Sequence, residues 1–429
     1  MMERTYVADV KAGKDVLLKG WVHEIRGLAK MKFILLRDVT GVMQCVLKLE
    51  SKGFNQEINL ESAVSVKGKT KTAKLTNEDL TVKNIEVEVS ELELLSRSEK
   101  LPIQVNEKGT KAELPTRLDY RYLDLRKPRI KAIFKIQSVI INSFREFFSG
   151  KEFIEIQPPG IIATSTEGGT DLFEVKYFDR KAYLAQSPQL YKQLAAISLE
   201  RVFSTSAVWR AEKHDTSKHI NEVRQMDIEV AFADDKQIMK HLEQVIEFIV
   251  KKVMSECKYE LDLLKVNLKV PKVKYMTYNE AISVLNKNGF KLKSGDDFEP
   301  EAERKLCSLF PDTLIFTYEW PSNMKPFYIW PKDKQSEKGV SGGFDAVYGG
   351  VEISSGGQRV HVPDILIQQL KKKGLNPEDF KWYVDAFRYG APMHAGWSIG
   401  LERLTQAMLK LDNIREATMF PRDRRRLTP

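Results

Sequence analysis

Short runs of alternating or β-branched hydrophobic residues dominate the first part of the chain. Five such runs fall within residues 1–97, and breaks that contain glycine or asparagine separate them. None of the runs has the three-and-four spacing of apolar residues that marks a long amphipathic helix. Five short strands without such a helix are typical of an OB-type barrel, whose open face binds oligonucleotides. The pattern therefore predicts a small β domain over residues 1–97.

A charged connector, interrupted by prolines, follows at residues 98–127 and separates this domain from a region with a different pattern. Residues 130–148 carry apolar side chains at helical spacing and predict a long amphipathic helix. Its single apolar stripe fits either the core of one chain or an interface between two copies. Residues 202–209 and 223–232 predict two antiparallel strands joined by a long polar loop. We therefore expect a second domain, with helices and antiparallel strands, over residues 128–429.

Residues 234–325 show packing patterns but no residue arrangement that indicates chemistry, and we interpret them as an insertion in the second domain. Apolar spacing in and just after this stretch predicts several elements. They are helices at 236–257, 278–288 and 300–309, strands at 313–318 and 326–330, and a mobile loop at 332–343.

Length and charge narrow the class of protein. A chain of 429 residues is too long for one ordinary core, so two domains are expected. The net charge of +9 favours a polyanionic partner over a small acidic molecule. No apolar run reaches the roughly 18 residues of a membrane helix, and the first residues lack the apolar core of a secretion signal, so we expect a cytoplasmic protein without a membrane partner. The three cysteines fit neither a disulfide framework nor a zinc site: Cys45, Cys257 and Cys307.

Candidate ligand-binding charges lie at the end of one predicted strand and the start of one predicted helix. Arg210 and Glu212 are two residues apart, so both leave the same face of the strand. A guanidinium can hold a phosphate while a carboxylate accepts from an exocyclic amine, although a cross-strand ion pair is the alternative. Lys192 falls in the first turn of a helix for which Ser187 is the predicted N-cap. The helix dipole disfavours a cation there, which favours an anionic ligand over a solvated surface lysine.

Oxygen ligands lie on two adjacent predicted strands, at Asp345, Glu352 and Ser355. Because Mg²⁺ takes one or two carboxylates together with ligand phosphates, this set predicts a magnesium site. Arg359 follows with a planar fork that can grip a carboxylate at two points, unless a local acid pairs with it. In the predicted barrel, Phe33 is placed to stack on a base and Gln44 to bind a base edge. The alternative is that aromatic residues of the barrel, such as Phe33 itself, belong to its core.

Three motifs, in the expected order, resemble those of class II aminoacyl-tRNA synthetases. Residues 153–159 resemble motif 1, residues 210–222 resemble motif 2, and residues 396–404 resemble motif 3. Residues 20–44 resemble the anticodon-binding barrel of the aspartyl, asparaginyl and lysyl enzymes. Over essentially the whole chain, the resemblance is strongest to the archaeal and eukaryotic type of aspartyl-tRNA synthetase.

The resemblance implies an α+β protein in which an OB-fold barrel is joined to a class II catalytic domain with an antiparallel sheet flanked by helices. It implies a homodimer formed through the 130–148 helix and motif 1. The implied activity is the ATP- and Mg²⁺-dependent attachment of L-aspartate to tRNA-Asp through aspartyl-adenylate. The alternatives are an asparaginyl-tRNA synthetase and a non-catalytic tRNA-binding paralogue. Lys192 argues against asparagine, because with Arg359 it would place two cations on one ligand side chain.

The resemblance also assigns roles to individual residues, and one residue can have several. Catalysis is assigned to Arg210, Glu352 and Arg403, and metal binding to Glu352, Ser355 and Asp345. ATP binding is assigned to Arg210, Ala211, Glu212, Lys218, His219, Ile220, Glu352, Gly400, Leu401, Glu402 and Arg403. Aspartate binding is assigned to Glu167, Gln189, Lys192, Arg210, Ser355 and Arg359. Anticodon contacts are assigned to His23, Arg26, Phe33 and Gln44.

Position 23 bears on which tRNA is charged. Family members restricted to tRNA-Asp tend to carry Trp where this chain has His23, whereas members that also charge tRNA-Asn tend to carry His. Imidazole can donate to or accept from either pyrimidine at the third anticodon position, so we expect both tRNAs to be aspartylated, unless His23 is only a solvated barrel residue. The loop at residues 74–77 lacks the proline common in relaxed enzymes and does not support this expectation. Val223 stands where many members have a phenylalanine that stacks on adenine, which leaves the stacking partner open.

Overall fold

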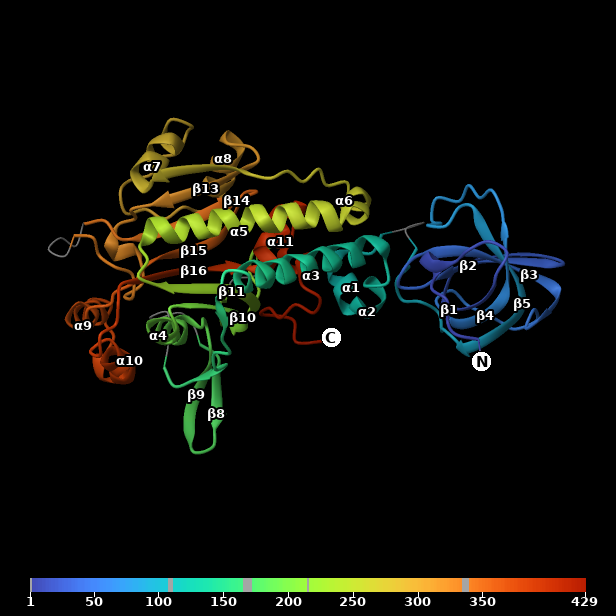
Figure 1. Ribbon diagram of the computed structural model, residues 1–429, viewed down its shortest axis with the longest axis horizontal. Coiled ribbons are helices and arrows are strands. Elements are labelled where there is room, and N and C mark those ends of the chain that lie inside the picture. The colour runs from blue at the N-terminus through green and yellow to red at the C-terminus, as the bar shows by residue number, and fades with distance from the viewer. Residues whose placement is uncertain (1, 107–110, 165–171, 214–215, 334–338) are drawn as a thin grey trace. The chain divides into compact units, whose positions relative to one another are not determined.

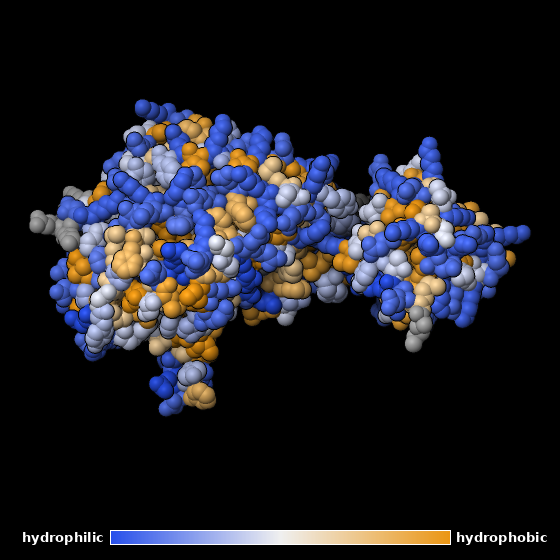
Figure 2. Space-filling view, viewed as in Figure 1, coloured by the Kyte–Doolittle hydropathy of each residue, from blue (hydrophilic) through white to orange (hydrophobic). Residues whose placement is uncertain are grey.

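The computed structural model describes residues 2–106, 111–164, 172–213, 216–333 and 339–429. It divides into two compact units, Met1–Lys127 and Pro128–Pro429 (Figure 1). Each unit has its own hydrophobic core, and hydrophilic residues surround scattered hydrophobic ones on the face shown in Figure 2. Among the described residues, no helix combines the length and the apolar character needed to cross a membrane.

The N-terminal unit is built on a closed five-stranded barrel with strand order β1-β2-β3-β5-β4, which confirms the predicted OB-type fold. Alternate residues of each strand point inward, as in Ile34 and Leu36 of β2 and Met43, Cys45 and Leu47 of β3, and all five are fully buried. The strands are β1 (Asp15–Leu28), β2 (Met31–Arg37), β3 (Val42–Lys52), β4 (Ala63–Thr72) and β5 (Ile85–Ser96), preceded by the short helix η1 (Val7–Asp9). Two short helices follow the barrel, α1 (Leu114–Asp119) and α2 (Arg121–Asp124).

A buried polar cluster lies at an irregularity in β1, where the pairing with β2 shifts register between Val22 and Glu24. Arg37 donates two hydrogen bonds to the carboxylate of Glu61, at 2.8 and 2.6 Å, and its Nη1 lies 2.9 Å from Nδ1 of His23. Arg126, after α2, also reaches Glu61 at 3.0 Å. His23 is only 5% exposed, so the alternative of a solvated residue at this position is wrong.

The C-terminal unit is built on an eight-stranded sheet with strand order β12-β13-β14-β15-β16-β11-β10-β6. All neighbouring strands pair antiparallel except at the two edges, where β12 runs parallel to β13 and β6 parallel to β10. The strands are β6 (Ile154–Glu155), β10 (Arg201–Trp209), β11 (Glu222–Ala231), β12 (Lys272–Thr277), β13 (Thr313–Tyr318), β14 (Gly343–Tyr348), β15 (Val351–Gln358) and β16 (His394–Gly400). A small second sheet contains β7 (Ile161–Ile162), β8 (Glu174–Tyr177) and β9 (Arg180–Leu184).

Two long helices cover one face of the large sheet, α3 (Pro128–Ser149) and α5 (Asp235–Glu256) (Figure 1). Asp234 and Gln237 form a capping box that starts α5. Trp397 of β16 is fully buried and donates from Nε1 to the carbonyl of Ile238 in α5 at 3.0 Å. The remaining helices are α4 (Gln189–Leu199), α6 (Lys258–Leu264), α7 (Tyr278–Asn286), α8 (Pro300–Leu309), α9 (Pro363–Lys372), α10 (Lys381–Ala386) and α11 (Leu401–Leu409), with short helices η2 (Ser322–Met324), η3 (Pro377–Phe380) and η4 (Ile414–Ala417).

The predicted helix at 130–148 is confirmed as α3, and its apolar stripe belongs to the core of a single chain. Ile136, Ile140 and Phe144 have no exposed surface. Phe144 packs edge-on against Trp397, with ring centroids 6.2 Å apart. The stripe is therefore no argument for an interface between two copies.

Several local predictions are wrong. The run at 326–330 is no strand, because only an isolated bridge pairs Ile329 with Arg359. Strand β12 was not predicted. It lies at the edge of the sheet, and its sequence contains too many polar residues to show a clear apolar alternation. Helix α4 begins one residue later than expected, so that Pro188 and not Ser187 stands at its N-cap.

The cluster around Glu61 generates a prediction about the stability of the barrel. Glu61→Gln is expected to lower the local free energy of unfolding by about 3 to 5 kcal/mol, because it leaves the buried Arg37 without its carboxylate. Hydrogen exchange of peptides from residues 15–96 measures this loss. Glu57→Gln is the control, since Glu57 pairs with Arg97 at an exposed site and should change the free energy by less than about 1 kcal/mol. Equal losses in both variants would contradict the structural role of the cluster.

Candidate active site

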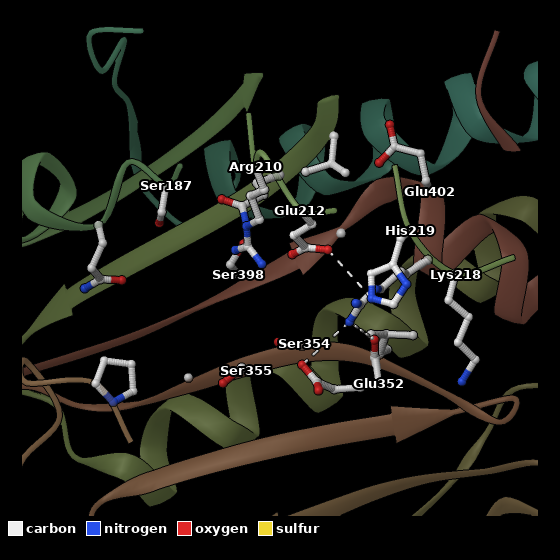
Figure 3. A pocket seen from close by; sticks show the side chains of 18 of the residues that line it. Ser187, Arg210, Glu212, Lys218, His219, Glu352, Ser354, Ser355, Ser398 and Glu402 are labelled. Atoms are coloured by element: carbon white, nitrogen blue, oxygen red, sulfur yellow. Dashed lines mark hydrogen bonds and ion pairs between the residues drawn. The ribbon is translucent and has the colours of Figure 1, made fainter. Parts of the chain in front are cut away.

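A cavity of about 260 Å³ opens on the face of the large sheet (Figure 3). Its lining comes from β11, β15 and β16, the start of α4 and the loop between β10 and β11. Most of the residues predicted for ligand binding line it together. They are Gln189, Lys192, Arg210, Glu212, Lys218, His219, Ile220, Glu352, Ser355, Arg359, Gly400, Glu402 and Arg403.

A few predicted site residues do not line this cavity. Ala211 and Leu401 adjoin lining residues in the chain, and Asp345 lies one strand away on β14. Glu167 and the glycines after it lie outside the described residues. The same is true of residues 334–338 in the loop predicted at 332–343.

Arg210 presents an open guanidinium to the cavity. Its Nε is buried and has no hydrogen-bond partner within the described structure, and no ion pair joins it to Glu212 there. The carboxylate of Glu212 instead lies 3.7 Å from Nε2 of His219 (Figure 3). Asn221 fixes the backbone beneath both residues by donating to the carbonyls of Arg210 and Glu212, at 2.7 and 3.0 Å. A buried donor without an acceptor is costly, so this site favours an anionic ligand over the alternative of a cross-strand ion pair.

Lys192 and Arg359 form a buried quartet with two acids that the sequence reading missed. Nζ of Lys192 donates to Asp227 at 2.9 Å and lies 3.6 Å from Glu229. Arg359 donates to both oxygens of Glu229, at 2.9 and 3.2 Å. All four side chains are at most 2% exposed.

The quartet corrects the expectation that two uncompensated cations face a ligand. Its two positive charges are balanced by two negative ones, so total charge does not select the ligand. Burial raises the pKa of Asp227, and the adjacent ammonium of Lys192 opposes that rise. A signal for both acids was present in the sequence, because Gln225, Asp227 and Glu229 alternate along β11 and so share one face.

Although the total charge of the quartet does not distinguish a carboxylate ligand from an amide, the hydrogen-bonding groups that face the cavity do. Lys192 and Arg359 line the cavity, whereas Asp227 and Glu229 are not part of its lining. Ammonium and guanidinium groups only donate hydrogen bonds. A carboxylate offers two acceptor oxygens to the two cations, whereas an amide offers one, and its NH₂ group finds no acceptor in either cation. This end of the cavity therefore fits a carboxylate.

A chain of hydrogen bonds holds Gln189 at the same end of the cavity. Gln189 donates to Oε1 of Gln193 at 2.8 Å, and the hydroxyl of Tyr383 donates to that oxygen at 2.9 Å. Nε2 of Gln193 lies 2.8 Å from Nε2 of His394, whose Nδ1 lies 2.9 Å from the carbonyl of Pro392. These partners require His394 to donate from Nδ1 and accept at Nε2, and burial lowers its pKa. His394 is thus a neutral structural residue.

Two carboxylates lie at the opposite end, and the pKa of one of them, Glu352, is perturbed. Burial, and then the charge of Asp345, raises the pKa of Glu352 to about 7. Nη1 of Arg403 donates to the carbonyl of Glu352 at 3.1 Å and lies 3.8 Å from its carboxylate. Asp345 is held at 2.5 Å by Lys325 and stands opposite Ser355 in the strand register. A raised pKa means that the ionised form of this carboxylate is poorly stabilised by its surroundings. A bound cation would stabilise it, so Glu352 is a suitable metal ligand.

The oxygen atoms at this end fit Mg²⁺ only together with a ligand. Nowhere in the described ranges do three His, Cys, Asp or Glu side chains converge so as to hold a metal ion. Glu352 and Ser355 line the cavity and could supply two ligands, whereas Asp345 is already paired with Lys325. The remaining positions would fall to phosphate oxygens and water, which is the usual arrangement for Mg²⁺.

The region interpreted as an insertion does contribute to the cavity, which corrects the expectation that it only packs. Glu303 of α8 lies 3.2 Å from Nζ of Lys218, a lining residue that also points toward the carbonyl of Gly350. The charge of Glu303 also acts to raise the pKa of Glu352. Spacing along the chain gave no sign of this, since Glu303 is one acid on an amphipathic helix.

The candidate nucleic-acid residues of the barrel occupy different environments. Phe33 and Gln44 are half-buried, and Gln44 donates to Glu86 at 2.8 Å. Arg26 is exposed and paired with Glu24 at 2.6 Å. Phe33 precedes the inward-facing Ile34 on β2 and is not part of the barrel core, so the core alternative does not hold for it.

Comparison with known proteins gives one consistent result. The family model described as tRNA synthetases class II (D, K and N) matches residues 113–424, and the model of an OB-fold nucleic acid binding domain matches residues 16–95. The aspartate–tRNA(Asp/Asn) ligase of Methanocaldococcus jannaschii is 43% identical over 99% of this chain and 98% of its own. The aspartate–tRNA(Asp) ligase of Pyrococcus horikoshii is 44% identical over 97% of both chains.

Solved structures agree with this result. The asparaginyl-tRNA synthetase of Pyrococcus horikoshii, complexed with asparaginyl-adenylate, superposes with a TM-score of 0.92 at 34% identity and full coverage of both chains. The aspartyl-tRNA synthetase of Entamoeba histolytica gives a TM-score of 0.89 at 31% identity, over 100% of this chain and 93% of its own.

The buried quartet generates a prediction about folding. Arg359→Met is expected to lower the free energy of unfolding by about 3 to 5 kcal/mol, because Glu229 loses its main partner while staying buried. Adding Glu229→Gln should recover most of that loss, as urea unfolding of the two variants measures. Arg388→Met, which removes an exposed partner of Asp385, is the control and should have little effect. A double variant no more stable than the single one would contradict the pairing.

Proposed function

The chain belongs to the class II tRNA synthetases for aspartate, lysine and asparagine, and we propose that it attaches L-aspartate to tRNA in two ATP-dependent steps. The α-carboxylate of aspartate attacks the α-phosphorus of ATP, which releases pyrophosphate and leaves aspartyl-adenylate. A hydroxyl of the terminal adenosine of tRNA then takes the aspartyl group and releases AMP. No side chain needs to act as a nucleophile, so catalysis rests on positioning and on charge stabilisation.

The open guanidinium of Arg210 is the observation that carries this proposal. Its buried, unpartnered Nε and its place beside Glu212 suit the α-phosphate of a nucleotide whose adenine amine donates to that carboxylate. Arg403 and Lys218 line the same cavity and would meet the outer phosphates. Val223 also lines it, and its small side chain leaves the imidazole of His219 as a flat group for the adenine.

Mg²⁺ is the proposed cofactor, held by Glu352 and Ser355 together with phosphate oxygens. When bound, it would neutralise phosphate charge that grows on the leaving pyrophosphate. Asp345 supports the site from the next strand through its charge, while Lys325 keeps it in place.

Aspartate is favoured over asparagine by the donors that face the ligand. Lys192 and Arg359 present only N–H groups to the cavity, as two carboxylate oxygens require. The names of three relatives agree, since they are aspartate ligases at 42 to 44% identity, whereas the asparaginyl enzyme of similar structure is 34% identical. A non-catalytic paralogue is disfavoured because the motif arginines and the candidate metal ligands are present and line one cavity.

A second copy of the chain and the tRNA are the proposed macromolecular partners. Apolar residues that stay exposed near motif 1 and after α11 support a homodimer, namely Ile154, Met419 and Phe420. For tRNA, the support is the OB-fold unit and the relatives, some named for tRNA-Asp alone and others for tRNA-Asp and tRNA-Asn.

We propose that both tRNA-Asp and tRNA-Asn are aspartylated. The reason differs from the one expected from the sequence, because the imidazole of His23 is not free both to donate and to accept. A guanidinium only donates, so Nδ1 of His23 must accept from Arg37 and the ring proton is on Nε2. Burial also lowers the pKa of His23, which keeps it neutral. The one group that it can offer a base is therefore an N–H donor, and both cytosine and uracil carry an O2 acceptor, so this donor alone does not separate the two anticodons.

Amino-acid specificity is tested by ATP–pyrophosphate exchange without tRNA. Aspartate should support exchange and asparagine should not, and exchange driven by asparagine alone would overturn the assignment. The Arg359→Met/Glu229→Gln variant, which retains a balanced core, should lose about 2 to 5 kcal/mol of aspartate affinity because the ligand carboxylate has lost one donor. Its ATP affinity serves as the internal control and should stay unchanged.

Specificity for tRNA is tested by aspartylation of tRNA-Asp and tRNA-Asn transcripts. The two values of kcat/KM are expected to differ by less than about a hundredfold, which corresponds to roughly 2.7 kcal/mol. His23→Trp should widen the difference, because the indole fills space next to the base and cannot replace the bond to Arg37. Val39→Trp places the same bulk on an exposed turn of the barrel and should leave the ratio unchanged. A wild-type ratio above about a hundredfold would rule out relaxed specificity.

A further inference from the structure

The loop that joins β10 to β11 supplies one wall of the cavity, and it needs support from elsewhere in the chain. Glu212, Lys218, His219 and Ile220 all line the cavity from this loop. Loops of this length and polarity bury little apolar surface, so holding one conformation costs backbone entropy that other contacts must offset.

A segment near the C-terminal end of the chain supplies such contacts to the described part of the loop. The backbone N–H of Ile414 donates to the carbonyl of Ser217 at 2.9 Å, and the N–H of Asn221 donates to the carbonyl of Arg422 at 2.7 Å. Arg424 donates from Nη1 to the carbonyl of Lys213 at 3.1 Å. Both ends of the loop are thus fastened to residues 414–424.

One ion pair organises this segment. Arg415 donates from Nε to Asp423 at 2.6 Å, and from Nη1 to the carbonyl of Thr216 at 3.0 Å. The two charged side chains are 11% and 8% exposed. The other oxygen of Asp423 accepts from the backbone N–H groups of Arg425 and Arg426, at 2.9 and 3.0 Å. Asp423 therefore shapes the turn that brings the segment back to the loop.

We propose that residues 414–424 form a clasp that positions the β10–β11 loop for ATP, with Arg415 and Asp423 as its positioning residues. The choice of ATP rests on the proposed function. Arg415 and Asp423 do not line the cavity and act through the loop, although Ile414, the first residue of the clasp, does line it. The clasp contacts the nucleotide end, whereas Lys192 and Arg359 belong to α4 and to the segment after β15. Loss of the clasp should therefore weaken nucleotide binding selectively.

Asp423→Asn tests the clasp, because it keeps the size of the side chain and removes the charge that holds Arg415. We expect KM for ATP in pyrophosphate exchange to rise about tenfold, with KM for aspartate changed by less than about twofold. Arg415→Lys, which keeps the charge but loses the two-pronged contact, should give a smaller rise of the same kind. Asp385→Asn is the matched control, since Asp385 pairs with Lys381 and Arg388 on the exposed side of α10 and should change neither value.

A second measurement separates the clasp from the proposed function. Hydrogen exchange of peptides covering residues 210–221 should become faster in Asp423→Asn and stay as in the wild type in Asp385→Asn, whatever reaction the protein catalyses. Direct titration with ATP should show the same loss of affinity.

Unchanged hydrogen exchange of the loop in Asp423→Asn would overturn the clasp, and so would equal rises in the KM values for ATP and aspartate. Should Asp423→Asn fail to fold, the same readouts in Arg415→Lys decide the matter. A wild-type protein that exchanges pyrophosphate with no amino acid would instead refute the proposed function, and loop exchange would still test the clasp.

Discussion

Two positive and two negative charges buried together constrain much of the C-terminal unit. Desolvating such groups is tolerable only when each meets an opposite charge in good geometry, and removing any one leaves a buried charge uncompensated. The quartet joins α4, β11 and the segment after β15, and Lys192 also donates to the carbonyl of Trp397 in β16. Elements far apart in sequence must therefore keep their register. The same requirement fixes Lys192 and Arg359 where they line the cavity, so the constraint on folding also prepares the ligand site.

Local periodicity was enough to predict most of the fold. The barrel follows from alternating runs that bury one face of each strand, and α3 follows from an apolar stripe whose members are buried in the chain. Periodicity failed to predict segments in which the pattern of apolar residues does not match the pattern of strand pairing. An apolar run at 326–330 packs as irregular chain because only one bridge pairs it, and β12 is too polar at its edge position to stand out.

Parts of the site were predictable from motifs, and the rest depended on contacts between distant residues. Arg210 and Glu352 are predicted from residue type and spacing, and Arg403 from the resemblance of residues 396–404 to motif 3. All three line one cavity. Asp227 and Glu229 share one face of β11, but nothing in that strand's sequence indicates that Lys192 and Arg359 lie opposite this face. Glu303 and the residues that bind the loop carbonyls could not be found this way, since their roles depend on which helix or tail reaches the cavity.

The connection between the C-terminal segment and the β10–β11 loop has a consequence for the order of folding. Arg424 and Lys213 are 211 positions apart, and Arg415 and Thr216 are 199 apart. Contacts of such long range form late, because the intervening chain must first be brought together. The sheet shares this property, since Lys192 and Trp397 are 205 apart and the interior strand β16 ends at Gly400, shortly before residue 414. During synthesis, which proceeds from the N-terminus, the closing strand of the sheet and the residues that hold the nucleotide wall therefore leave the ribosome in close succession, so a nascent chain gains its complete core and its nucleotide wall at the same late stage.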